Sequence, residues 1–168
     1  MDALFGLIAK IVIALSVYAI IKIIYLVFRI IANWKIFTKA GEKGWKTFIP
    51  LVNTYTEFKI AWSKKAFWIY MLLSVLTGVG MWWYRDVYLI NPDNFNKTLA
   101  AVILVLTLLV AIASTVLIFI YYGKLSKAFG HGFGFTLGLI LLEPIFIMIL
   151  GFGKDEYLGT EEHPAIKA

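Results

Sequence analysis

The sequence predicts an all-α membrane protein: a helical bundle of about four transmembrane helices with one amphipathic helix on the cytoplasmic surface. Of its 168 residues, 61% are hydrophobic and 15% are charged, whereas soluble domains average roughly 45–50% and 25%. The apolar residues form a few long runs, and a helix needs about 20 such residues to cross the hydrocarbon. Basic residues gather between the runs. We therefore expect one membrane domain over residues 1–168.

The first apolar run, over residues 4–34, is interrupted only by Lys10, Lys22 and Arg29. As a helix it is about 46 Å long at 1.5 Å per residue, which exceeds the ~30 Å hydrocarbon layer. One end must therefore protrude. Because the run lacks the short core and small-residue cleavage site of a signal peptide, we expect an uncleaved first helix.

Polar side chains recur along one face of this first helix at 100° per residue. They are Tyr18, Lys22, Tyr25, Arg29 and Asn33. A polar stripe of this kind faces water or protein rather than lipid. An alternative fits the length equally well: the membrane span is 4–21, Lys22 extends its ammonium to the interface, and Arg29 already lies in the cytoplasm.

Residues 48–62 predict an interfacial helix. Large apolar side chains recur there at spacings of three and four residues, and Pro50 stands near the start. These side chains are Phe48, Leu51, Tyr55, Phe58 and Trp62. An aromatic face on a helix indicates a position in the membrane surface. Packing of the same face against the protein's own helices is an equally good interpretation.

The second and third membrane helices are expected over residues 66–84 and 98–122. No charged residue lies between Lys65 and Arg85, or between Lys97 and Lys124. Both intervals are long enough for a helix to span the hydrocarbon.

A fourth membrane helix is expected over residues 133–152, followed by a tail at 153–168. The pair Glu143-Pro144 interrupts the helix, so we expect it to cross with a kink; in the alternative it dips into the membrane and returns. A carboxylate at membrane depth requires a proton or a cation. We therefore predict a buried pair between Glu143 and Lys22.

The distribution of Lys and Arg predicts the orientation. The segment 35–65 holds seven of them, and Lys124 and Lys127 lie at the same end of the predicted bundle. By the positive-inside rule the 35–65 loop is cytoplasmic and the N-terminus is outside. The C-terminus is outside if the last helix spans, and cytoplasmic if that helix returns.

Two stretches near the predicted cytoplasmic side carry further motif residues. These are Lys39, Gly44, Trp45, Pro50 and Asn53, then Lys127, Gly130, Gly132 and Gly134. At these residues the chain resembles a family of small bacterial polytopic membrane proteins of unknown function, often labelled signal peptidase I by automatic annotation. The resemblance covers roughly residues 34–62 and 122–159. It implies a bacterial cytoplasmic membrane protein and brings no mechanism.

The residues argue against an enzyme. Signal peptidase chemistry needs a serine and a lysine on a folded domain outside the membrane, and the tail is too short to form one. The chain has no cysteine, and its only histidines, His131 and His163, lie away from the membrane serines. They supply neither a catalytic triad nor a zinc ligand set. No metal or cofactor is expected.

The function predicted from these observations is a non-enzymatic accessory or scaffold subunit of a membrane complex. Its partners are the lipid bilayer and a protein, either another chain or a second copy. The net charge of +6 is explained by the loops that flank the membrane, so no nucleic acid is expected. The alternative is a small oligomeric channel or transporter that uses Glu143 and the polar residues of the first helix.

Overall fold

The computed structural model describes residues 2–89 and 96–165. Within that part the chain is helical and contains no β-strand, as the sequence predicts. The α-helices are α1 (Asp2–Lys39), α2 (Pro50–Ala61), α3 (Lys64–Trp83), α4 (Lys97–Ala128), α5 (Phe133–Leu141) and α6 (Glu143–Phe152). A 3-10 helix, η1 (Gly44–Phe48), precedes α2, and a π-helical turn, η2 (Tyr84–Leu89), follows α3.

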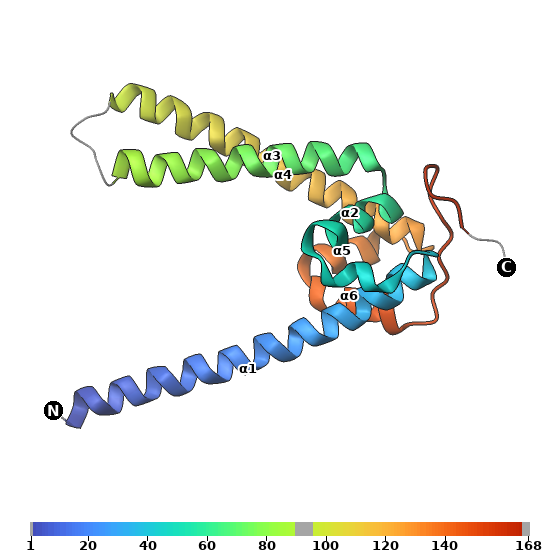
Figure 1. Cartoon of the computed structure of the whole chain (residues 1–168), viewed down its shortest axis with the longest axis horizontal. Helices are drawn as coiled ribbons and strands as arrows, with labels where there is room; N and C mark the ends of the chain where they lie inside the picture. The colour runs from blue at the N-terminus through green and yellow to red at the C-terminus, as the bar shows by residue number, and fades with distance from the viewer. Residues whose placement is uncertain (1, 90–95, 166–168) are drawn as a thin grey trace.

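Three helical segments in the described residues are long and apolar enough to cross a membrane: Leu4–Lys39, Lys64–Asp86 and Lys97–Ala128. Figure 1 shows α1 and the α3–α4 hairpin as two arms that diverge from one compact end. We call α1 up to residue 28 and the hairpin the membrane arms. The compact end, which we call the inner module, contains η1, α2, α5, α6, the chain after α6 and the adjoining ends of α1, α3 and α4.

The inner module has a continuous apolar core. Its largest fully buried apolar side chains are Phe37, Phe58, Ile60, Leu125, Leu139 and Leu150. Close backbone approach between α1 and α6 depends on Gly151, where an added Cβ would lie 2.7 Å from Cα of Ala32. The core therefore joins the first and last helices of the chain directly.

The α3–α4 hairpin is held by small residues and by caps. A Cβ at Gly80 would lie 2.2 Å from Oγ1 of Thr107, so the missing side chain lets the two helices approach. At the helix starts, Ser63 accepts a hydrogen bond from the backbone N–H of Ala66, and Asn96 caps α4 in the same way.

The prediction of one continuous helix over 133–152 is wrong. The chain breaks at Leu142 (φ −132°, ψ 44°) and forms α5 and α6 instead. Pro144 explains the break, because it lacks the N–H that would continue the ladder of α5, while it fits the first turn of α6. Neither helix is a candidate span, so the described chain has three candidate spans rather than about four. Instead, α5 and α6 pack against each other and α6 packs against α1; the alternative of a dip into the membrane and a return stays a prediction.

The tail after α6 is attached to the inner module. The backbone N–H of Leu158 donates to the carbonyl of Ala128 at 2.8 Å. The hydroxyl of Tyr157 lies 2.8 Å from the carbonyl of Ile60, and Nε2 of His163 lies 2.9 Å from the carbonyl of Ala40. The tail thus contacts the inner ends of α1, α2 and α4.

The helices also run further than expected at their inner ends. The first was expected to end at residue 34 and the third at 122, yet α1 continues to Lys39 and α4 to Ala128. Lysines between the apolar positions do not stop a helix. These extra turns carry apolar residues, including Phe37 and Leu125, that pack in the inner module.

Candidate functional site

A cavity of about 220 Å³, which we call the polar chamber, lies where the two membrane arms meet the inner module. Residues from five helices line it. The titratable ones are Arg29, Glu57, Tyr70, Tyr121, Tyr122 and Glu143. A concave site with a few converging polar groups among apolar walls is typical of a binding site.

An ion pair closes one side of the polar chamber. Nη2 of Arg29 lies 2.8 Å from Oε1 of Glu143. Nη1 of Arg29 donates to the Tyr25 hydroxyl at 3.1 Å, and that hydroxyl donates to Oε2 of Glu143 at 3.4 Å. Tyr25 and Arg29 are one turn apart and share a face of α1. Glu143 stands in the first turn of α6, where the helix dipole favours a carboxylate.

Glu57 forms the second side of the chamber. Its Oε1 accepts from the side-chain amides of Asn33 at 2.8 Å and Asn53 at 3.2 Å. Burial raises the pKa of Glu57 to about 7; the charge of Arg29 opposes this shift and that of Glu143 adds to it. The carboxyl of Glu57 therefore titrates close to neutrality.

The partner of Glu143 is Arg29, and the predicted pairing with Lys22 is wrong. Lys22 is exposed, and its ammonium lies 5.4 Å from the ring centroid of Tyr18. Because α6 is short and stays in the inner module, Glu143 reaches α1 only at the level of Tyr25 and Arg29. The polar stripe is therefore divided, with its inner residues in the site and its outer ones on the membrane arm.

The stripe predicted for the interfacial helix is divided as well. Phe58 is buried, Tyr55 and Trp62 pack partly against the core, and Phe48 and Leu51 are exposed. The ring of Phe58 stacks on that of Tyr121 with centroids 4.8 Å apart. The half with Phe58 thus packs on the protein's own helices, and a position of the exposed half in the membrane surface stays a prediction.

Several motif residues hold the inner module together. Nζ of Lys39 donates to the carbonyls of Leu150 and Gly153, at 2.6 Å and 2.9 Å, at the C-terminal end of α6. A Cβ at Gly44 would lie 2.4 Å from the ring of Trp34. Gly130 has a φ of 77° in the turn after α4, a conformation that favours glycine.

The other motif residues have less specific positions. Pro50 begins α2, and the side-chain amide of Asn53 donates to Glu57 without lining the chamber. Trp45 and Lys127 are exposed. Around Gly132 and Gly134 the described chain leaves open space within 4 Å of an added Cβ.

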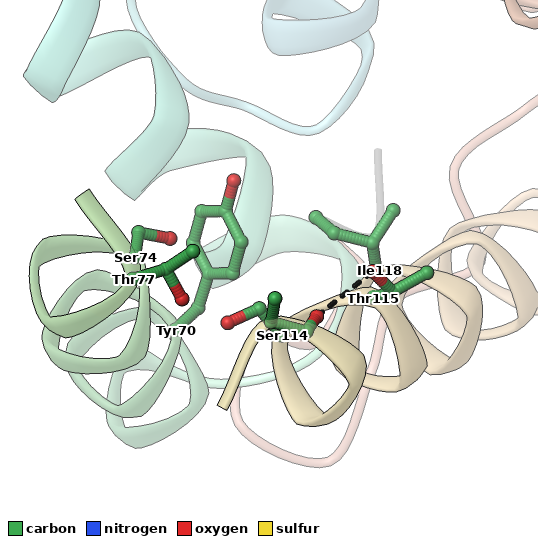
Figure 2. Close-up of a pocket in the computed structure, with 7 residues that line it drawn as sticks. Tyr70, Ser74, Thr77, Ser114, Thr115 and Ile118 are labelled. Atoms are coloured by element: carbon green, nitrogen blue, oxygen red, sulfur yellow. Dashed lines mark hydrogen bonds between the residues drawn. The ribbon is translucent and has the colours of Figure 1, made fainter. Parts of the chain in front are cut away.

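A second cavity, of about 330 Å³, opens between α3 and α4, and we call it the hydroxyl groove. Its lining includes Ser74, Thr77, Ser114 and Thr115, and Figure 2 shows these side chains around the space between the two helices. Tyr70 and Ile118 line both the groove and the polar chamber. Hydropathy alone does not predict this groove, although the serine and threonine residues within the two apolar runs are a visible signal of it.

The histidines lie outside the polar chamber. The His131 ring stacks on Phe135 with centroids 3.9 Å apart, and its Nε2 lies 3.3 Å from Oδ2 of Asp155. His163 belongs to the tail. In the residues that the structure describes, no group of three or more His, Cys, Asp or Glu side chains is arranged to hold a metal ion.

Comparison with known proteins gives one result. A family model matches residues 45–160, and its description is a family of unknown function. The matched region begins after α1 and includes Glu57, Tyr121 and Glu143 but not Arg29. No curated protein and no solved structure matches the chain.

Proposed function

Since this chain belongs to the DUF5684 family, whose function is unknown, we propose from the structure that it is a non-enzymatic membrane subunit. In this proposal it holds a transmembrane helix of a partner protein, or of a second copy, between its membrane arms. The observation that carries the proposal is the separation of α1 from the α3–α4 hairpin.

The membrane part of α1 has no partner within the described chain. Every residue from 4 to 24 is exposed, and α1 makes no contact with α3 or α4. The end of the same helix is packed tightly against α6. One helix thus combines a fixed end with an open arm, as expected of a subunit that receives another helix.

The hydroxyl groove offers a suitable surface for that helix. Membrane helices associate through small residues and through hydrogen bonds between helices. The hydroxyls of Thr77, Ser114 and Thr115 donate to carbonyls of their own helices at 2.9, 3.0 and 2.9 Å. Their oxygens keep free acceptor capacity toward the groove. Small side chains there leave room for a partner helix.

Site-specific photo-crosslinking in native membranes tests the proposal. A photoreactive side chain at position 114 is compared with one at Ile112, which is exposed on the same helix outside the groove lining. We expect position 114 to give one defined crosslinked product, and the complex purified in mild detergent to contain the same partner in stoichiometric amount.

A matched pair of substitutions completes this test. Ser114→Leu fills the groove and should release the partner, whereas Ile112→Leu should leave the complex intact. Recovery of a monomer in mild detergent, or a complex that survives Ser114→Leu unchanged, would refute the proposed function.

A second candidate, a small oligomeric channel or transporter, is favoured by the continuity between the two cavities. Tyr70 and Ile118 join the polar chamber to the hydroxyl groove, so polar groups extend from the inner module into the α3–α4 hairpin. Three candidate spans enclose little volume, so a pathway would require several copies. Ion or solute flux in liposomes that is lost with Glu143→Gln would support this candidate.

A further inference from the structure

We propose that the polar chamber binds an organic ammonium group, supplied either by a small soluble amine or by the headgroup of an amine-bearing lipid. The inference concerns a ligand of the chamber and does not depend on the partner helix proposed above. It is drawn from the charges in the chamber, its aromatic walls and its position.

The chamber has an excess of negative charge. Arg29 is already paired with Glu143 at 2.8 Å, which leaves Glu57 without a cationic partner within 4.0 Å in the described chain. Both amide hydrogen bonds to Glu57 end on Oε1. Oε2 therefore has no protein donor among the described residues, and it is the atom that an ammonium N–H would reach.

The walls of the chamber suit a cation rather than an anion. Tyr70, Tyr121 and Tyr122 line it beside Glu57, whereas the faces of Phe58, which also lines it, are stacked on Tyr70 and Tyr121. Aromatic rings attract ammonium groups through their electron-rich faces, and tyrosine hydroxyls accept hydrogen bonds. A phosphate would find a single arginine there, already neutralised by a carboxylate. Burial is the largest cause of the raised pKa of Glu57, and the charge of Arg29, which is shared with Glu143, opposes it only in part.

The position of the chamber gives it access to both sources of amine. Tyr70 lies five residues after Lys65, and Tyr122 lies two before Lys124. Lysines at the ends of a membrane helix mark the level of the lipid headgroups, so the chamber lies close to that level. A volume of about 220 Å³ accommodates a small headgroup, and the exposed apolar residues 4–24 of α1 leave a surface for acyl chains next to it.

The first test uses the full chain, purified in detergent without amine lipids and kept in phosphate buffer, because Tris is itself an amine. Ethanolamine and methylamine, which are both protonated and carry ammonium N–H donors, are titrated, with KCl at equal ionic strength as control. The unfolding temperature and the heat of binding are recorded. We expect a saturable stabilisation by the amines that KCl does not reproduce. Glu57→Gln should weaken the affinity for the amines by at least about tenfold. The exposed Glu161→Gln should leave it unchanged.

The second test identifies the source. The chain is reconstituted with phosphatidylethanolamine or phosphatidylglycerol and examined by native mass spectrometry. Retention of phosphatidylethanolamine that is lost with Glu57→Gln indicates a lipid headgroup, whereas binding of free ethanolamine alone indicates a soluble amine. If Glu57→Gln does not fold, Tyr122→Phe, which removes only a hydroxyl, should weaken binding several-fold. The proposal is overturned if neither amine source binds better than its control, or if the variants bind as the native chain does.

Discussion

The inner module and the membrane arms differ in how their helices are held. In the inner module, α1 meets α6 so closely that Gly151 has no room for a Cβ beside Ala32. In the arms, α1 is exposed over residues 4–24 and touches neither α3 nor α4. Helix α1 is therefore tightly packed at one end and exposed at the other.

This difference suggests a division of roles: the inner module determines how the chain folds, and the membrane arms are available to bind other molecules. Packing, hydrogen bonds and the ion pair in the inner module set the mutual positions of the helices. The outer parts of the arms are free to interact with lipid or with another protein, because α3 and α4 contribute to the core cluster only at their ends next to the inner module. Substitutions in the two regions should consequently have unequal effects, and four comparisons test this expectation.

The largest effect is expected from Gly151→Leu. The added side chain would clash with the backbone of α1 at Ala32. Overpacking in a core lowers the free energy of unfolding by about 1–3 kcal/mol or more. We expect the upper end of this range or no folded protein. Gly78→Leu is the matched control, because nothing lies within 4 Å of a Cβ there. Thermal unfolding and size-exclusion chromatography in detergent measure both. Equal losses of stability in the two variants would show that the inner module and the membrane arms do not differ in packing.

The next largest effect is expected at the Arg29–Glu143 pair. Arg29→Met and Glu143→Gln should each lower the free energy of unfolding by about 1–3 kcal/mol, because each leaves a partly buried partner without its counter-charge. The double variant should recover part of the loss. Lys22→Met, on the exposed arm, should change the free energy of unfolding by less than about 0.5 kcal/mol. Additive losses in the double variant would show that the pair is not coupled.

A pH effect of intermediate size is expected from Glu57. Its pKa is about 7 in the folded chain against an ordinary value of 4.5, so the folded state binds more protons between these values. Stability should therefore decrease as pH rises from about 4.5 to about 7 and level off above. Glu57→Gln should remove this component, as measured by thermal unfolding in detergent.

The other titratable groups in the chamber all remain in the Gln variant; they are Arg29, Tyr70, Tyr121, Tyr122 and Glu143. The difference between the two pH curves therefore isolates Glu57. Parallel curves for the native chain and the variant would contradict the assignment.

The smallest effect on stability is expected in the hydroxyl groove. Ser114→Ala removes a hydroxyl that bonds only to a carbonyl of its own helix, so the free energy of unfolding should change by less than about 0.5 kcal/mol. Unfolding temperatures in detergent check this. A larger loss would assign the groove to the internal packing of the hairpin rather than to a partner.

The sequence was sufficient for the fold class and for two of the long helices, because a charge-free apolar run can hardly adopt another structure in a membrane. It was insufficient for residues 133–152. Hydropathy continues through Glu143 and Pro144, so composition alone does not distinguish a kink from a break. The decision depends on the α1–α6 contact, which is remote in the sequence.

The site was predicted in part for the same reason. Glu143 and the residues Tyr25, Arg29 and Asn33 were recognised, since polar groups in apolar runs are conspicuous. The partner of Glu143 depends on how far α6 extends beside α1, which no local pattern reveals. Glu57 was not predicted as a site residue, because its place beside Asn33 follows from tertiary packing alone.

The hydrogen bonds from Lys39 to the end of α6 have a consequence for biosynthesis. Their acceptors, Leu150 and Gly153, are made more than a hundred residues after the lysine. The first helix therefore emerges from the ribosome long before the inner module can fold. Arg29 has no counter-charge until Glu143 has been synthesised. During that interval the nascent chain carries exposed charge near the membrane surface, and the native packing begins only when almost all of the protein has been synthesised.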